Sequence, residues 1–251
     1  MREPISGDAR LALDLALTIR HDGNDGVADD LTDAAGLTAW VRAHRDDLPS
    51  VGGDPSDDRG AAQRPADGDG AAARRQADGD GAAAQRQADG GWGAARRSAD
   101  GDWDAFTADA GQLTAVRELR AAVRALFARA VRPGERSPAD AARFLPLPEA
   151  VRHLNEAAAR TPTVPVLDWP AGAGPDVRRR PVGAGDDLTA ALAHAVIAFL
   201  SSSERDRLRA CHAPRCGRYF LKEHPRQEWC NPSCGNRARV ARHHQRYKAT
   251  A

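Results

Sequence analysis

All four cysteines of the chain lie within 24 residues near its C-terminal end, and the first 210 residues contain none. They form two close pairs, Cys211 with Cys216 and Cys230 with Cys234, separated by 13 residues. A chain wraps one tetrahedral zinc ion in this way, each short pair supplying two thiolates while the loop brings the pairs face to face. Because Zn–S bonds are about 2.3 Å long, all four sulfurs must then meet in one small cluster. We predict a zinc site with these four ligands.

Two disulfides or free thiols are the alternatives to zinc, and the expected cytoplasmic location argues against disulfides. Four cysteines close the metal's coordination shell, so the zinc would be structural rather than catalytic. His212 and His224 could each replace a cysteine, but we expect both at the surface. Four thiolates on Zn²⁺ leave a formal charge of −2, which Arg215, Arg218 and Arg237 could offset because they are close in sequence.

The segment that holds the cysteines is also basic. From residue 204 to residue 251 there are 12 Lys or Arg and 4 Asp or Glu, a net charge of +8, so the first 203 residues carry −7 within a total of +1. A basic end on a mildly acidic body suggests a polyanionic partner, and a solvated basic tail is the alternative.

The stretch "GNRARVARHHQRYK" (235–248) has no helix breaker after its glycine and predicts a C-terminal helix. At 100° per residue, three of its arginines fall within about 60° of one another. We expect Val240 and Tyr247 to pack back on the zinc knuckle, while the arginine face contacts phosphate. The candidate nucleic-acid contacts are Arg237, Arg239, Arg242, Arg246 and Lys248.

The rest of the chain shows mainly helical periodicity. Leucines alternate in "LALDLALTI" (11–19), where both a strand and a helix fit, and we choose a helix; Asp14 within it could cap, pair internally or line a ligand pocket. Only "VPVLDWP" (164–170) and "RRRPV" (178–182) look extended, as one small hairpin. Other apolar stripes predict helices with these core residues: Leu37, Trp40, Val41, His44 and Leu48; Val116, Leu119, Val123, Leu126 and Phe127; Val151, Leu154 and Ala158; Leu188, Leu192, Val196 and Phe199 or Leu200.

Residues 55–104 differ from their surroundings. "ADGDGAAARRQ" (66–76) recurs in related form with a period of 11 residues, and each unit carries helix-breaking Asp-Gly steps. With almost no large aliphatic residues to bury, this segment is expected to be a disordered insertion rather than a solenoid, and its Trp92 and Trp103 to pack locally. The predicted organisation is a mainly α body in two parts, 1–54 and 105–203, interrupted by 55–104 and followed by a zinc finger and basic helix, 204–251.

The C-terminal segment resembles the CGNR zinc finger. The likeness spans about residues 205–248 and rests on the ordered cysteines, the Tyr219-Phe220 pair, Trp229-Cys230 and "CGNR" at 234–237. The body resembles, more weakly, the ABATE domain that commonly precedes this finger. This likeness rests on "RLALDLALT" (10–18), "DLTDAAGLTAWVRAH" (30–44), "LTAVRELRAAVRALF" (113–127), "AVRHLNEAAAR" (150–160) and "LAHAVIAFL" (192–200).

The resemblance implies a mainly helical body, a zinc-bound finger and a stress-related transcriptional regulator that binds DNA. Two departures from the family pattern stand out. Where family members often have an Asn-Thr pair, this chain has Leu17-Thr18, and a role of that Asn in holding a ligand or a turn would be lost or altered. The 11-residue repeats are not part of the family pattern either.

Three functions remain open. A DNA-binding regulator would bind nucleic acid through 235–248, while its body senses a small-molecule effector or mediates homodimerisation. A protein-interaction module would use zinc only to stabilise a small lobe. An enzyme or ligand-binding body is the third, but His44, His153 and His194 lie singly on helical stripes, and no phosphate loop or nucleophile elbow occurs, so we expect no enzyme. Without an apolar run of eighteen residues or a secretory signal, we expect no membrane partner and a cytoplasmic protein.

Overall fold

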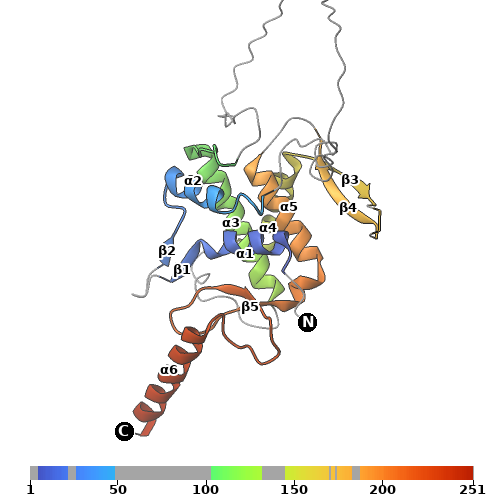
Figure 1. The fold of residues 1–251 in the computed structure, drawn as a ribbon. Helices are drawn as coiled ribbons and strands as arrows, with labels where there is room; N and C mark the ends of the chain where they lie inside the picture. Colours follow the sequence, from blue (N-terminus) through green and yellow to red (C-terminus); the bar gives the residue numbers. More distant parts are fainter. Residues whose placement is uncertain are drawn as a thin grey trace, which may run out of the picture.

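The computed structural model describes residues 5–21, 27–48, 103–131, 145–169, 171–172, 174–182 and 187–250. The predicted repeat insertion, apart from its last two residues, lies outside the described residues. Helices form the body and a separate helix extends from its lower end (Figure 1). The helices are α1 Gly7–Leu17, α2 Ala34–Ala43, α3 Ala110–Ala130, α4 Leu147–Ala159, α5 Leu188–Ser201 and α6 Pro232–Thr250, with a 3₁₀ helix η3 at Ser203–Arg207.

The longest helix, α3, lies at the centre of the body, where α1, α4 and α5 pack around it (Figure 1). Its first turn is fixed by a capping box, in which Asp109 accepts from the Gln112 N–H and the Gln112 side chain accepts from the Asp109 N–H. Side chains around most of its circumference are buried, as expected of a helix surrounded by others. The predicted stripe of this helix is therefore confirmed.

Two further helices begin at acidic caps. Asp33 accepts from the Gly36 N–H and starts α2, and Asp187 accepts from the Thr189 and Ala190 N–H groups and starts α5. The ambiguous leucine-rich segment is helical, as chosen, because Leu11 and Leu15 both face the core while Ser6 caps its first turn.

The fold contains more β-structure than the sequence predicted. Three antiparallel two-stranded hairpins are present in the described part of the chain: β1 Ile19–His21 with β2 Val27–Asp29, β3 Thr163–Asp168 with β4 Asp176–Pro181, and β5 Leu208–Ala210 with β6 Tyr219–Leu221. Only β3–β4 was predicted. Strands of three residues are too short to show a two-residue alternation, so β1–β2 and β5–β6 could not be recognised from pattern. The fold is mainly α, with small sheets added.

Two predictions about individual side chains require correction. Val151 was placed on the buried stripe of α4 but is 41% exposed, because Ala150, Leu154, Ala157 and Ala158 form the face that packs on the core. Trp103 packs locally, as expected, against Phe106 with the ring centroids 5.8 Å apart, but it was assigned to the insertion and is instead 6% exposed in the core. The second part of the body therefore already includes Trp103.

The core continues from the body into the C-terminal segment. Phe127 of α3 makes edge-on ring contacts with Phe199 of α5 and with Tyr219 of β6, at centroid distances of 5.6 and 5.5 Å. Tyr219 is 1% exposed, so the hairpin that carries it is anchored in the main core. No helix among the described residues is long and apolar enough to cross a membrane.

Candidate metal centre and nucleic-acid interface

The four cysteine sulfurs meet at one point, all within 4.8 Å of one another. The Cys216 and Cys230 sulfurs are 3.7 Å apart and the Cys230 and Cys234 sulfurs are 3.4 Å apart. A tetrahedron with Zn–S bonds of about 2.3 Å has sulfur–sulfur edges of about 3.8 Å. All four are free thiols, which excludes the disulfide alternative. The donor set and its spacing fit a metal ion, and zinc is the ion that four thiolates in this arrangement most commonly hold.

The first cysteine pair is held by the β5–β6 hairpin. Cys211 follows β5 directly, and its N–H donates to the Arg218 carbonyl at 2.8 Å, extending the ladder by one residue. Between the cysteines the chain makes a tight turn, in which the Cys216 N–H donates to the Ala213 carbonyl at 3.0 Å. Pro214 is the second residue of this turn and Arg215 the third, with φ at +58°. Proline followed by a residue of positive φ is the pattern of a type II turn.

The second cysteine pair is placed by the start of α6. Asn231 caps this helix, its Oδ1 accepting from the Cys234 N–H at 2.9 Å, and Pro232 is the first helical residue. Cys234 therefore projects from the first turn. A Cβ on Gly235 would lie 3.1 Å from Cδ1 of Trp229, so glycine lets the indole lie against the helix. The predicted helix is confirmed, and it begins before the last cysteine.

Hydrogen bonds among the cysteine sulfurs favour the ionised form of Cys211 and the protonated forms of Cys216 and Cys230. Hydrogen bonds from the Cys216 and Cys230 thiols, with further bonds from the Cys230 and Ala213 N–H groups, lower the pKa of Cys211 to about 2, although burial opposes this. Because the Cys211 sulfur accepts those protons, its hydrogen bonds raise the pKa of Cys216 and of Cys230. Four thiols this close cannot all ionise alone, whereas a dication supplies the charge that makes four thiolates stable.

One predicted nucleic-acid residue turns out to face the cysteine cluster. Arg237 Nη2 donates to the Cys234 sulfur at 3.0 Å, so its charge offsets that of the thiolates. This matches its other predicted role, beside the metal. Arg218 contacts the cysteines through its backbone: its carbonyl accepts from the Cys211 N–H, and its own N–H donates to the Cys216 sulfur.

The other predicted residues lie farther along α6, which extends away from the body (Figure 1). Arg239, Arg242 and Arg246 are exposed; the Lys248 side chain lies outside the described residues. The expectation that Val240 and Tyr247 pack on the knuckle is wrong, since they are 52% and 69% exposed. The helix diverges from the knuckle after Ala238, which is 5% exposed; from there to Tyr247 no residue of α6 is buried. His212 and His224 are exposed, as predicted.

An open groove of about 530 Å³ lies between the loop before Cys230 and the first turns of α6. Sequence analysis singled out three of its lining residues, Cys230 as a metal ligand and Arg239 and Arg242 as nucleic-acid contacts. It did not single out Arg226, and it used Trp229 only as part of a motif. The position of Arg226 in the sequence did not indicate that it lies beside the α6 arginines, because the fold of the loop brings these residues together. The groove is lined by Arg226, Gln227, Glu228, Trp229, Cys230, Asn231, Pro232, Gly235, Arg239 and Arg242.

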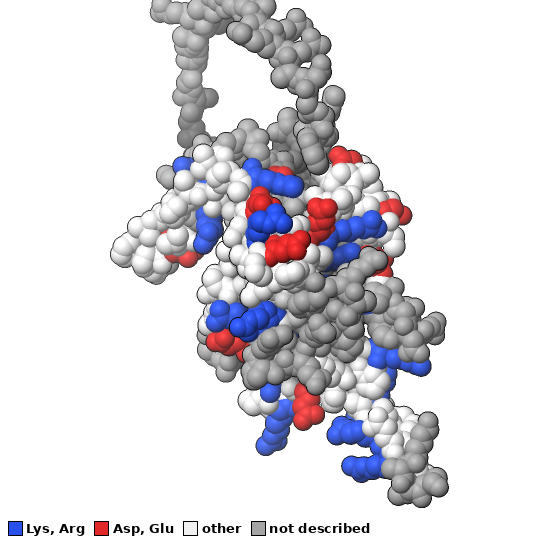
Figure 2. All heavy atoms as spheres, turned by 180° about the vertical axis from the view of Figure 1, so that it is seen from behind, with Lys and Arg blue, Asp and Glu red and all other residues white. Residues whose placement is uncertain are grey.

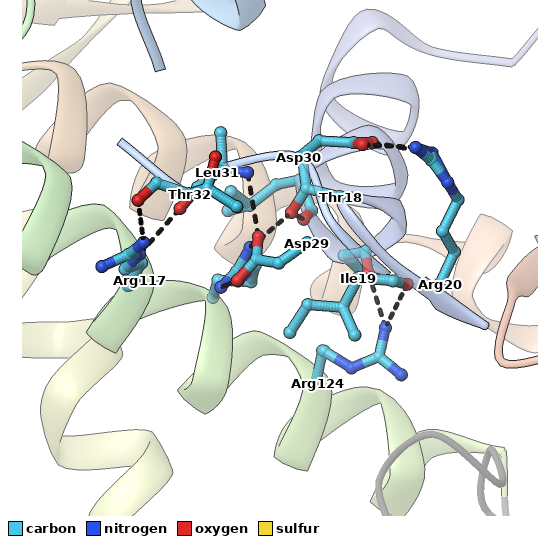
Figure 3. Close-up of polar contacts among 12 residues, drawn as sticks. Thr18, Ile19, Arg20, Asp29, Asp30, Leu31, Thr32, Arg117 and Arg124 are labelled. Atoms are coloured by element: carbon cyan, nitrogen blue, oxygen red, sulfur yellow. Dashed lines mark hydrogen bonds and ion pairs between the residues drawn. The ribbon is translucent and has the colours of Figure 1, made fainter. Parts of the chain in front are cut away.

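Arginines of α3 contact the end of α1 and the β1–β2 hairpin (Figure 3), and one of them, Arg124, also bonds to the cysteine-bearing segment. Arg124 is 3% exposed and donates to the carbonyls of Ala16 at 2.6 Å and of Gly217 at 3.3 Å, the latter between the second cysteine and β6. Its guanidinium lies 5.3 Å from the centroid of the Tyr219 ring. These residues were not predicted, although arginines within an apolar helical stripe are a visible signal.

Another of these α3 arginines, Arg120, is 4% exposed and holds the β1–β2 hairpin. It donates to both carboxylate oxygens of Asp29, at 2.5 and 2.7 Å, and to Thr18 Oγ1 at 3.0 Å. Its bonds lower the pKa of Asp29, outweighing the opposing effect of burial, which is the largest single cause. Thr18, at the place of the family's Asn-Thr pair, therefore ends α1 and positions Arg120.

The remaining candidate residues have structural partners. Asp14 pairs with His44, and the distance from Asp14 Oδ2 to His44 Nε2 is 3.4 Å. Of the three roles considered for Asp14, the structure therefore shows the internal pair. The His194 ring nitrogen Nε2 lies 2.9 Å from the Thr161 carbonyl oxygen, and His153 lies 3.8 Å from Glu149.

The comparisons with known families agree with this geometry. Residues 207–247 match the CGNR zinc finger. Residues 9–203, more than half of the chain, match the ABATE family, described as "Putative stress-induced transcription regulator". A search of curated proteins finds no match. The chain therefore belongs to the ABATE family, and its body is followed by a CGNR zinc finger.

Proposed function

We propose that the protein is a DNA-binding transcription regulator in which the metal-bound knuckle holds α6 against the phosphates of a duplex. The observation that carries this proposal is the charge and isolation of α6. The helix has 19 residues, no Asp or Glu, and exposed side chains around its outer turns. A helix that is polar on all sides and projects from its domain requires a partner or a solvent-exposed role.

The dimensions of α6 suit a duplex. An α-helix is about 10–12 Å across with its side chains, and the major groove of B-DNA is about 12 Å wide. On the face shown in Figure 2 the projecting helix presents arginine side chains without acidic neighbours. Arg239, Arg242 and Arg246 share one side of it, so three cations can meet one phosphate backbone.

The metal centre supports this use of α6 by fixing the helix's direction. Cys234 lies in the first turn of the helix, whereas Cys211 and Cys216 lie between the strands of the β5–β6 hairpin, which Tyr219 anchors in the body core. A regulator of this kind acts on cellular DNA, in agreement with the expected cytoplasmic location. We propose no catalytic role, since His44, His153 and His194 each have a structural partner.

A salt titration of DNA binding tests the proposal. Each lost phosphate contact should reduce the slope of log K against log salt by about 0.9, so replacing Arg239, Arg242 and Arg246 by Ala should reduce it by about three. A variant with Ala at Arg10, Arg45 and Arg152 removes the same charge from the body surface and should keep the wild-type slope. Equal slopes for wild type and the helix variant, or no binding by zinc-loaded wild type, would refute the proposal.

A protein-interaction function is the second candidate, and the β3–β4 hairpin favours it. Leu167 and Val177 are directly paired across the hairpin and are 64% and 62% exposed, and Trp169 beyond them is 66% exposed. Exposed apolar residues on one face of a hairpin often mark a contact with another protein. If two copies of the chain pair through this face, Leu167→Asp should dissociate the dimer. Sedimentation of the wild type and of the variant would detect the change in mass.

A further inference from the structure

The groove beside the metal centre combines two features that a phosphate contact alone does not require. It is lined by three arginines from two segments, Arg226 of the loop and Arg239 and Arg242 of α6, and it is also lined by the indole of Trp229. Its volume of about 530 Å³ is within the range of roughly 300–1,000 Å³ typical of small-molecule sites. It can therefore hold a group with both a negative charge and a flat ring.

The arginines of the groove are available for an external anion. Among the described residues, none of the three forms an ion pair with a carboxylate. In the part of the chain that the structure describes, the Arg239 side chain donates to the Asn236 side chain and the Arg242 side chain to the Ala238 carbonyl. Each donor–acceptor distance is 3.4 Å, near the limit for a hydrogen bond. Glu228 is the single acidic residue in the lining, so the groove has an excess of positive charge.

Trp229 has a fixed position in the groove. It packs against the cluster formed by the cysteines and remains half-buried, while the absence of a side chain on Gly235 lets it lie against the helix. A rigid aromatic beside arginines is the combination with which proteins bind unpaired bases, since the base stacks on the ring while the backbone meets the cations. Bases within a duplex do not offer their faces in this way.

We propose that this groove binds an unpaired nucleotide, with its base on Trp229 and its phosphate between Arg226 and the α6 arginines. The preferred ligand would be nucleic acid that contains a single-stranded stretch, such as an opened duplex. This inference rests on the proposed function and narrows its ligand class. Arg246 lies outside the groove, so it provides a separate measure of general phosphate binding.

The test compares a labelled single strand, the matching duplex and the same duplex with three unpaired nucleotides, by fluorescence anisotropy with the zinc-loaded full chain. Arg226→Ala should weaken binding of the two ligands with unpaired bases about fivefold or more, and of the duplex less than twofold. Trp229→Leu should do the same and Trp229→Phe should largely restore binding, since a phenyl ring also stacks. The control Arg246→Ala should weaken all three ligands alike.

Equal losses for duplex and single strand in Arg226→Ala, or undiminished single-strand binding by a Trp229→Leu protein that retains its zinc, would overturn the inference. If no long nucleic acid binds, the proposed function fails, and the groove is tested with adenosine monophosphate against ribose 5-phosphate by NMR. Tighter binding of the nucleotide that Trp229→Leu abolishes would uphold a nucleotide site, and equal binding would refute it. The unpaired nucleotide could come from DNA or from RNA, and comparing the affinities of the same strand made as DNA and as RNA distinguishes the two.

Discussion

Arg124 of the central helix donates through Nη2 to the carbonyl oxygen of Gly217, 3.3 Å away, so a buried charge of the body bonds directly to the segment that carries the cysteines. The same guanidinium donates to the Ala16 carbonyl at the end of α1. One side chain thereby ties α1, α3 and the finger together.

Replacing Arg124 by Met should therefore separate the finger from the body. The change leaves buried carbonyl groups without a donor, and we expect a loss of about 2–4 kcal/mol in the free energy of unfolding. Urea unfolding measures the loss, and amide exchange at residues 207–222 should speed up. Arg129→Met, at an exposed position of the same helix, is the control and should change stability by less than about 0.5 kcal/mol. Similar stability of the two variants would show that the Arg124 bonds contribute nothing.

Metal removal should unfold the C-terminal segment. The four sulfurs pack within one cluster whose other buried members are few, so the metal supplies much of the stabilisation there. Elemental analysis should find about one zinc per chain, and a chelator should abolish the protection of residues 211–234 from proteolysis while α1 and α3 stay folded. Cys234→Ser should lose the zinc and Ser233→Ala should keep it. Reduced, freshly purified protein without metal would contradict the assignment.

Gly235→Ala should weaken the metal centre in spite of alanine's better helix propensity. In an open helix this change would stabilise by about 1 kcal/mol, but here the new Cβ would lie 3.1 Å from Trp229. We expect faster zinc release to a chelator because the indole must move. In a Trp229→Leu background the obstacle is gone, and the same substitution should become stabilising. An unchanged effect in the two backgrounds would disprove the contact.

The pair of Asp14 and His44 should make stability depend on pH. A hydrogen bond that His44 Nε2–H donates to the Asp14 carboxylate raises the pKa of His44 above 6.5, with burial opposing. Because the folded pKa is raised, the contribution is fully present below pH 6.5 and is lost as pH rises through the raised value. Asp14→Asn should therefore cost up to about 1 kcal/mol at pH 5.5 and little at pH 8.5, whereas Asp46→Asn, at a position 90% exposed, should cost little at either pH. If Asp14→Asn lowers the free energy of unfolding equally at both pH values, protonation of His44 is not the cause of the loss.

Deleting the repeats at residues 66–98 should leave thermal stability almost unchanged, because they contain almost no large aliphatic residues to bury and closure entropy depends only weakly on chain length. Trp103→Ala, a few residues beyond, should cost about 3–5 kcal/mol since this side chain is 6% exposed in the core. Calorimetry of both variants checks the contrast. A large loss on deletion would show that the repeats pack on the body.

The sequence by itself was sufficient to predict that the four cysteines meet in one cluster, to place most helices and to indicate the family. Cysteine spacing carries that information because a zinc knuckle is a local structure, and helix caps such as Asp33 and Asp187 act within one turn. The apolar stripe of α3 was also sufficient to predict a helix at the centre of the fold.

Tertiary structure decided what lies between those elements. It turned Arg237 to a sulfur, left Val240 and Tyr247 exposed, buried Trp103, and brought Arg226 beside Arg239 and Arg242. It also set Arg124 against Gly217, 93 residues away in the chain. Contacts of this kind depend on the direction in which each element leaves its neighbours, and no local pattern of residue types encodes that direction.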